Sequence, residues 1–261
     1  RSVRHRETMM RLLLILLAAT SLLAQDPPES LLLGLPGPLG PPAAPPLIFV
    51  AISSYNNTAA QNAYSNAWVA TAPTANALLL SAVISTLGTA AHKPSAVQGH
   101  GATWTELLSI GLNTTGTLLS RLTVYYGVAA SPTTNVFQAR FGGTNLTGCS
   151  LYTVEWRNAE TSGGAANAIV QTATNRADAG ANPSVTLAAL AGSTNAVMAF
   201  FAGDLNPFGG TAEANWTEDR DTGFNVPATG IYACHITNST DNTVVVTRTA
   251  LDWAGVAVEI K

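Results

Sequence analysis

The chain offers few residues of the types that carry chemistry, and its two cysteines come first. Cys149 and Cys234 are the only cysteines. In an exported protein an even pair permits one disulfide bond. A bond that closes so long a loop would contribute about 4–5 kcal/mol in the chain-entropy account. The alternative is two buried free thiols, and the sequence leaves both open.

The histidines do not have the spacing of a known metal site. They are His5, His92, His100 and His235. No H-x-x-x-H pair and no histidine near a C-x-x-C pair is present. His92 and His100 flank one segment and could share a metal ion, but solvated loop side chains are the simpler interpretation. We therefore predict no metal site.

One acidic cluster stands out, at Glu218-Asp219-Arg220-Asp221, shortly after Asp204. A calcium site takes several oxygen ligands from neighbouring loops. The spacing does not match an EF-hand loop, and an arginine lies in the middle of the cluster. The sequence favours a salt-bridged or solvated loop at this position.

Two carboxylates lie beside tryptophans on expected strands, a pairing found where proteins handle sugars. Glu106 follows Trp104, and Glu155 precedes Trp156. Such a carboxylate can act as an acid or as a hydrogen-bond partner of a sugar, although it is more often a strand charge beside a core aromatic. No G-x-S-x-G elbow of a serine hydrolase occurs. We predict no catalytic residue, no cofactor and no enzyme activity.

Two further sets of residues bear on glycans. Exposed aromatic side chains could stack on sugars, and the candidates are Tyr125, Tyr152 and Trp216. Five N-x-S/T sequons provide candidate glycosylation sites, at Asn56, Asn113, Asn145, Asn215 and Asn238. These sites matter only in a host that glycosylates this motif, and several would arise by chance in a chain so rich in Asn, Ser and Thr.

The elements that must position these residues are β-strands. In residues 118–132 apolar side chains alternate with other types, the region is rich in β-branched and aromatic residues, and it ends at Ser-Pro. This period of two predicts a strand with one buried face. Similar strands are expected at 46–52, 77–85, 99–110, 135–141, 150–156, 184–190, 196–202, 231–237, 243–249 and 253–261.

Helical patterns are nearly absent. The short segments 59–64 and 188–191 are the only helix candidates, and 160–168 reads as a Gly/Ala/Ser loop. Roughly ten strands with regular turn signals predict an all-β protein, an antiparallel β-sandwich or jelly roll.

The chain divides into three regions. Residues 1–25 have a basic start and a short apolar run, which indicates a signal-peptide-like leader. The alternative is an uncleaved anchor, although the run is too short for a stable membrane span. Residues 26–46 form a Pro/Gly-rich linker with three G-x-y triplets, read as a polyproline spacer or as a trimer neck. Residues 47–261 form the sandwich domain.

The first strand of this domain follows the linker and is apolar on both faces. One hypothesis is that it is donated to a neighbouring subunit. The residues of this candidate donor strand are Leu47, Ile48, Phe49, Val50 and Ile52. Ordinary pairing within its own domain is the alternative.

The order of these strands and their aromatic residues resembles a known kind of domain. The resemblance rests on segments 77–85, 101–105 (GATWT), 122–129, 151–156, 196–201 and 253–260. Together they are similar to a β-sandwich domain that is common in bacterial secreted and phage-encoded surface proteins. The resemblance implies the fold and an exported location, and it implies no catalytic residues. The usual Gly-Asp before the first of these strands is replaced by Asn76-Ala77.

Composition points in the same direction. Only 10% of residues are charged, the formal net charge is −3, and no basic stripe occurs. Nucleic acid is therefore not an expected partner. We expect a secreted or cell-surface structural protein that assembles with itself into a filament or appendage. The alternatives are a carbohydrate-binding or adhesive module with glycan partners, and a phage virion decoration or fibre protein.

Overall fold

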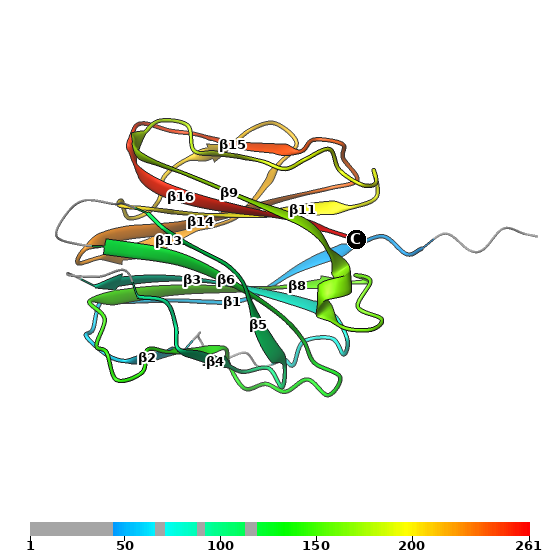
Figure 1. Cartoon of the computed structure of the whole chain (residues 1–261), viewed down its shortest axis with the longest axis horizontal. Coiled ribbons are helices and arrows are strands. Elements are labelled where there is room, and N and C mark those ends of the chain that lie inside the picture. Colours follow the sequence, from blue (N-terminus) through cyan, green and yellow to red (C-terminus); the bar gives the residue numbers. More distant parts are fainter. Residues whose placement is uncertain (1–43, 66–70, 88–91, 113–118) are drawn as a thin grey trace, which may run out of the picture. The chain divides into compact units, whose positions relative to one another are not determined.

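The computed structural model describes residues 44–65, 71–87, 92–112 and 119–261. The leader, nearly all of the linker and the sequon at Asn113 lie outside the described residues. Residues 45–261 form one unit, drawn in Figure 1. No helix in the described ranges is long and apolar enough to cross a membrane.

Sixteen antiparallel strands make up the described part of the chain, which confirms the all-β prediction with more strands than the ten expected. The first eight are β1 (Ile48–Asn57), β2 (Ala63–Ser65), β3 (Leu78–Leu87), β4 (Ala96–Gln98), β5 (Thr103–Gly111), β6 (Leu119–Val128), β7 (Gln138–Arg140) and β8 (Gly148–Arg157). The second eight are β9 (Ile169–Gly180), β10 (Ser184–Thr186), β11 (Ala196–Gly203), β12 (Thr211–Ala212), β13 (Thr217–Asn225), β14 (Ala228–Thr237), β15 (Thr243–Thr247) and β16 (Leu251–Ile260).

The strands form two five-stranded sheets and two three-stranded sheets. The five-stranded sheets have the orders β1-β8-β3-β6-β5 and β13-β14-β11-β16-β9. The three-stranded sheets have the orders β2-β7-β4 and β10-β15-β12. Figure 1 shows the five-stranded sheets in the middle, with β2 and β4 on one outer side and β15 on the other.

Three apolar cores separate these four layers. Leu80 of β3 and Phe200 of β11 belong to the central core between the five-stranded sheets. Val83 of β3 lies in one outer core, and Phe201 of β11 lies in the other. The inner strands of each five-stranded sheet are therefore buried on both faces, which explains why β3 and β11 are almost continuously apolar.

The two halves of the described chain share one topology. Adding eight to each strand number of β1-β8-β3-β6-β5 and β2-β7-β4 gives the other two sheets. Each half thus has eight strands in two layers, a five-stranded and a three-stranded sheet. We name them repeat 1 (β1–β8) and repeat 2 (β9–β16).

The sequence carries traces of this repetition. Trp104-Thr105-Glu106 precedes a bulge in β5, and Trp216-Thr217-Glu218 precedes a bulge in β13. Glu155 in β8 lies opposite Leu79 of β3, and Glu259 in β16 lies opposite Val197 of β11. The repeats therefore correspond in register as well as in strand order.

Several local expectations were wrong. Segments 59–64 and 188–191 are not helical, and segment 135–141 is a strand only over Gln138–Arg140. The expected loop at 160–168 ends in a short 3₁₀ helix, Ala165–Ala168. Strands β9 and β13 were not expected, because both lie at sheet edges and carry mainly polar side chains.

Candidate functional site

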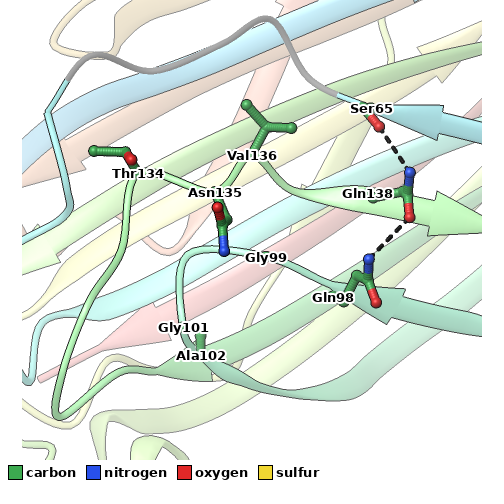
Figure 2. A pocket seen from close by; sticks show the side chains of 9 residues that line it. All are labelled: Ser65, Gln98, Gly99, Gly101, Ala102, Thr134, Asn135, Val136 and Gln138. Carbon is green, nitrogen blue, oxygen red and sulfur yellow. Dashed lines mark hydrogen bonds between the residues drawn. The ribbon is translucent and has the colours of Figure 1, made fainter.

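A polar groove of about 500 Å³ lies at one end of the outer sheet of repeat 1 (Figure 2). Among the described residues, no charged and no aromatic side chain lines it. Its lining residues are Ser65, Gln98, Gly99, Gly101, Ala102, Thr134, Asn135, Val136 and Gln138.

A row of hydrogen-bonded side chains forms one wall of the groove. Ser65, Gln138 and Gln98 lie directly opposite one another on β2, β7 and β4. Figure 2 shows Gln98 Nε2 donating to Gln138 Oε1 at 3.0 Å, and Gln138 Nε2 donating to Ser65 Oγ at 3.1 Å. Arg140 Nε also donates to Gln138 Oε1, at 2.8 Å. This row offers amide and hydroxyl groups of the kind that bind uncharged, hydroxyl-rich ligands.

A tight loop supports the groove. Gly99, His100 and Gly101 all have positive φ. A Cβ on Gly99 would lie 2.6 Å from Phe137 Cα, so the close approach of the two chain segments requires glycine there. The His100 N–H donates to Asn135 O at 2.6 Å, and Trp104 Nε1 donates to Gly99 O at 3.0 Å. These bonds fix the loop between β4 and β5.

His100 lies in this loop but does not line the groove. Its side chain is fully buried, and neither ring nitrogen has a hydrogen-bond partner. Burial lowers the pKa of His100 below its usual value, so the ring is neutral at pH 7. Across the described ranges, no three His, Cys, Asp or Glu side chains come together as a metal site.

The second polar cluster is a partly buried histidine–aspartate pair beside the central core. His235 Nδ1 lies 2.8 Å and 2.9 Å from the two carboxylate oxygens of Asp219. The imidazole stacks on Phe49 of repeat 1 at 4.2 Å and meets the edge of Trp156 at 5.5 Å. Burial raises the pKa of Asp219, and its hydrogen bond with His235 opposes this shift. Among the described residues, Asp219 is the hydrogen-bond partner of the His235 ring.

The predicted acidic loop is strand β13, which corrects the expectation from sequence. Glu218 accepts a hydrogen bond from Tyr232 Oη at 3.2 Å, and Asp221 accepts one from the Gly209 N–H at 2.9 Å. Asp219 occupies the bulge between Glu218 and Arg220. The bulge and the partners on neighbouring segments account for a strand where four consecutive polar residues had suggested a loop.

Replacing Asp221 with asparagine is expected to change how stability depends on pH. Burial raises the pKa of Asp221 above its usual 3.8, despite opposing backbone N–H groups. The folded chain therefore binds this proton more tightly than the unfolded chain. The resulting stability is fully present below pH 3.8 and is lost as pH rises through the raised pKa.

Because asparagine does not titrate, the stability advantage of wild type over Asp221→Asn should grow as pH falls from about 7 to about 4. Urea unfolding of both proteins across this range measures the difference. A difference that shrinks on acidification would contradict the raised pKa.

The two carboxylates beside tryptophans have structural partners. Glu106 forms an ion pair with Lys93 at 2.9 Å. Glu155 is buried and accepts hydrogen bonds from the Thr74 N–H at 3.2 Å and from Arg157 Nε at 2.7 Å. The structure does not place them as a catalytic pair.

The structure does not bring the two cysteines together. Cys149 and Cys234 are free thiols. Cys149 belongs to the outer core of repeat 1, and Cys234 belongs to the outer core of repeat 2. Burial raises the pKa of both thiols well above the usual value. A disulfide would have to cross the central core, so the alternative of two buried thiols describes this structure.

The structure shows the burial and pairing of the residues considered for glycan stacking, glycosylation and strand donation. The aromatic side chains considered for stacking are buried, which corrects that idea: Tyr125, Tyr152 and Trp216. Asn56 is half-buried and donates to Thr222 Oγ1 at 2.6 Å. The exposed sequon asparagines are Asn145, Asn215 and Asn238. Of the candidate donor residues, Leu47 directly precedes β1 and the others lie in β1, which pairs with β8 of its own chain.

The groove residues were not predicted from sequence. Gln98 and Gln138 are far apart in the chain, and only the register of β4 against β7 makes them neighbours. No spacing rule within the sequence carries this information. Comparison of the chain with protein families, with curated proteins and with solved structures finds no match in any of the three.

Proposed function

We propose that this protein is a non-enzymatic structural module of a secreted or cell-surface assembly, and that it associates with copies of itself through the edges of its sheets. The observation that carries the proposal is the set of open edges on the two large sheets. Within the described residues, β1, β5, β9 and β13 each pair on one side only. An edge strand presents unpaired N–H and C=O groups that can pair with another chain.

The state of the polar side chains also supports a structural role. The buried carboxylate of Glu259 accepts hydrogen bonds from the Ala191 N–H at 2.8 Å and from Asn195 Nδ2 at 2.6 Å. His235 and Asp219 bind each other. Groups that could do chemistry are thus engaged in holding loops and strands together. The low charge fraction of 10% suits a surface that meets other protein surfaces.

The mass of the full chain in solution tests the proposal. Light scattering coupled to size exclusion should give a multiple of the 26.9 kDa chain mass, and electron microscopy of the same sample should show defined particles or filaments. A leader removed during export would reduce the unit mass and leave the ratio unchanged. A protein that remains monomeric at all concentrations would contradict the proposal.

A glycan-binding or adhesive module is the second candidate, and the polar groove favours it. Its amide row could bind sugar hydroxyls. A glycan screen of wild type and Gln138→Ala decides this candidate: binding that is lost in the variant supports it, and no binding by wild type rejects it.

A further inference from the structure

We infer that strand β9 is the edge through which two copies of this chain pair, antiparallel and across a two-fold axis, so that two five-stranded sheets become one sheet of ten strands. This inference rests on the proposed function, since it names the surface used for self-association. It follows from differences among the four edge strands.

Three of the edges are interrupted or charged. The pairing of β1 with β8 shifts between Ala51 and Ser53, and that of β5 with β6 shifts between Glu106 and Leu108. Strand β13 has a bulge after Glu218 and carries four charged side chains in a row. Bulges and charges are the features by which natural edge strands avoid pairing with other chains.

Strand β9 differs from the other edges in its regularity. From Gln171 to Ala177 it pairs with β16 in seven consecutive steps without a shift, and its irregularities lie outside this run. This is the longest uninterrupted run among the four edges. The run QTATNRA contains no lysine and no proline, and Arg176 is its only charged residue. In the part of the chain that the structure describes, no strand covers its outer edge.

The run is complementary to itself. When two copies pair antiparallel about Thr174, the middle residue, all seven residues find a partner. Thr174 then lies opposite Thr174 of the partner subunit, and Arg176 lies opposite Thr172 of the partner subunit, so no like charges face each other. Threonine pairs directly across antiparallel strands are favourable. An isologous pairing of this kind closes at two subunits and leaves no further β9 edge exposed.

The side chains on this strand permit such an approach. Thr174, Asn175 and Arg176 are exposed. Gln171 and Asn175 lie on the face of β9 opposite to Thr174. There Asn175 Nδ2 donates to Ser184 O at 2.8 Å, and Gln171 Nε2 donates to Glu259 Oε2 at 2.6 Å. These bonds hold β9 against its own repeat, so the strand is already extended before a second copy arrives. Little ordering is needed on association.

Thr174→Lys tests the inference on the full chain, since it places two ammonium groups opposite each other at the two-fold axis. Sedimentation equilibrium should show a dissociation constant weakened by about tenfold or more. The matched control is Thr105→Lys, an equally exposed threonine on the bulged edge β5, which should associate like wild type. Thermal unfolding of both variants should match wild type, because both positions are on the surface.

Mixing two variants with opposite charges at residue 174 makes the test specific. Thr174→Glu alone should also weaken association, and an equimolar mixture of Thr174→Lys and Thr174→Glu should restore it as a mixed dimer. If wild type associates and the residue 174 variants associate as strongly, the β9 pairing is overturned while the proposed self-assembly stands. Wild type that remains monomeric would overturn both. A mixture that stays monomeric would overturn the two-fold pairing about Thr174.

Discussion

Trp156→Ala should lower the free energy of unfolding by about 3–5 kcal/mol, the range for removing a large aromatic side chain from a core. Trp156 is fully buried in the central core. Its ring meets the edge of Phe49 at 5.4 Å and of His235 at 5.5 Å, so it joins β1 and β8 of repeat 1 to β14 of repeat 2. The substitution leaves a cavity at the point where the repeats meet. Urea unfolding followed by far-UV circular dichroism, which reports on the backbone, measures the change.

Trp156→Phe is the control for this experiment. The indole Nε1 has no hydrogen-bond partner, so phenylalanine removes volume without breaking a hydrogen bond. We expect a loss of about 1–2 kcal/mol, well below that of alanine. A loss below about 1 kcal/mol for Trp156→Ala would show that the two repeats are not held together by a closely packed central core.

Glu259→Ala should lower the free energy of unfolding by about 3 kcal/mol, because it removes a buried carboxylate that accepts hydrogen bonds from three donors. The carboxylate is fully buried and receives hydrogen bonds from the Ala191 N–H, Asn195 Nδ2 and Gln171 Nε2, at 2.6–2.8 Å. These donors belong to the loop before β11 and to β9. Without the carboxylate, the side-chain amide of the buried Asn195 and the Ala191 N–H lose their acceptor, and the loop is released.

The equivalent residue of repeat 1 should show a smaller effect. Glu155 accepts from the Thr74 N–H and from Arg157, whose side chain is 44% exposed and can turn to water. We expect Glu155→Ala to cost about 1–2 kcal/mol. The exposed pair of Glu106 with Lys93 gives the baseline, since Glu106→Ala should cost less than about 1 kcal/mol. If urea unfolding shows that Glu106→Ala costs as much stability as Glu259→Ala, or more, this account is contradicted.

The sequence predicted the buried strands well and the edge strands poorly, for a physical reason. Strands β3, β11 and β16 are covered on both faces, so their segments are mostly apolar and easily recognised. Strands β9 and β13 lie at edges, where polar side chains are tolerated on both faces. Their pattern resembles that of a loop. For residues 118–132 the period of two suggested one buried face, whereas β6 places Val124 in the central core and Tyr125 in an outer core.

The repetition and the groove were beyond the reach of local patterns. The residues shared between the repeats are few and include Trp-Thr-Glu before the bulges and Val-Glu near the end of β8 and β16, and loops of different length separate them. Trp104 and Trp216 had each been noted, but nothing related one to the other before the registers of β5 and β13 were known. The amide row of the groove likewise depends on pairing between short strands that are distant in sequence.

The two repeats are arranged like the two subunits of a dimer that have been joined into one polypeptide. The segment between Arg157 and Ile169 connects them. In a dimer of separate chains, the interface is lost on dilution, because association is bimolecular. Here the tether holds the two partners at a high effective concentration, so the central layer persists in a single molecule. Fusion also frees each half to change its sequence independently. One outer layer could then acquire a groove such as that at Gln138 without any change in the other layer.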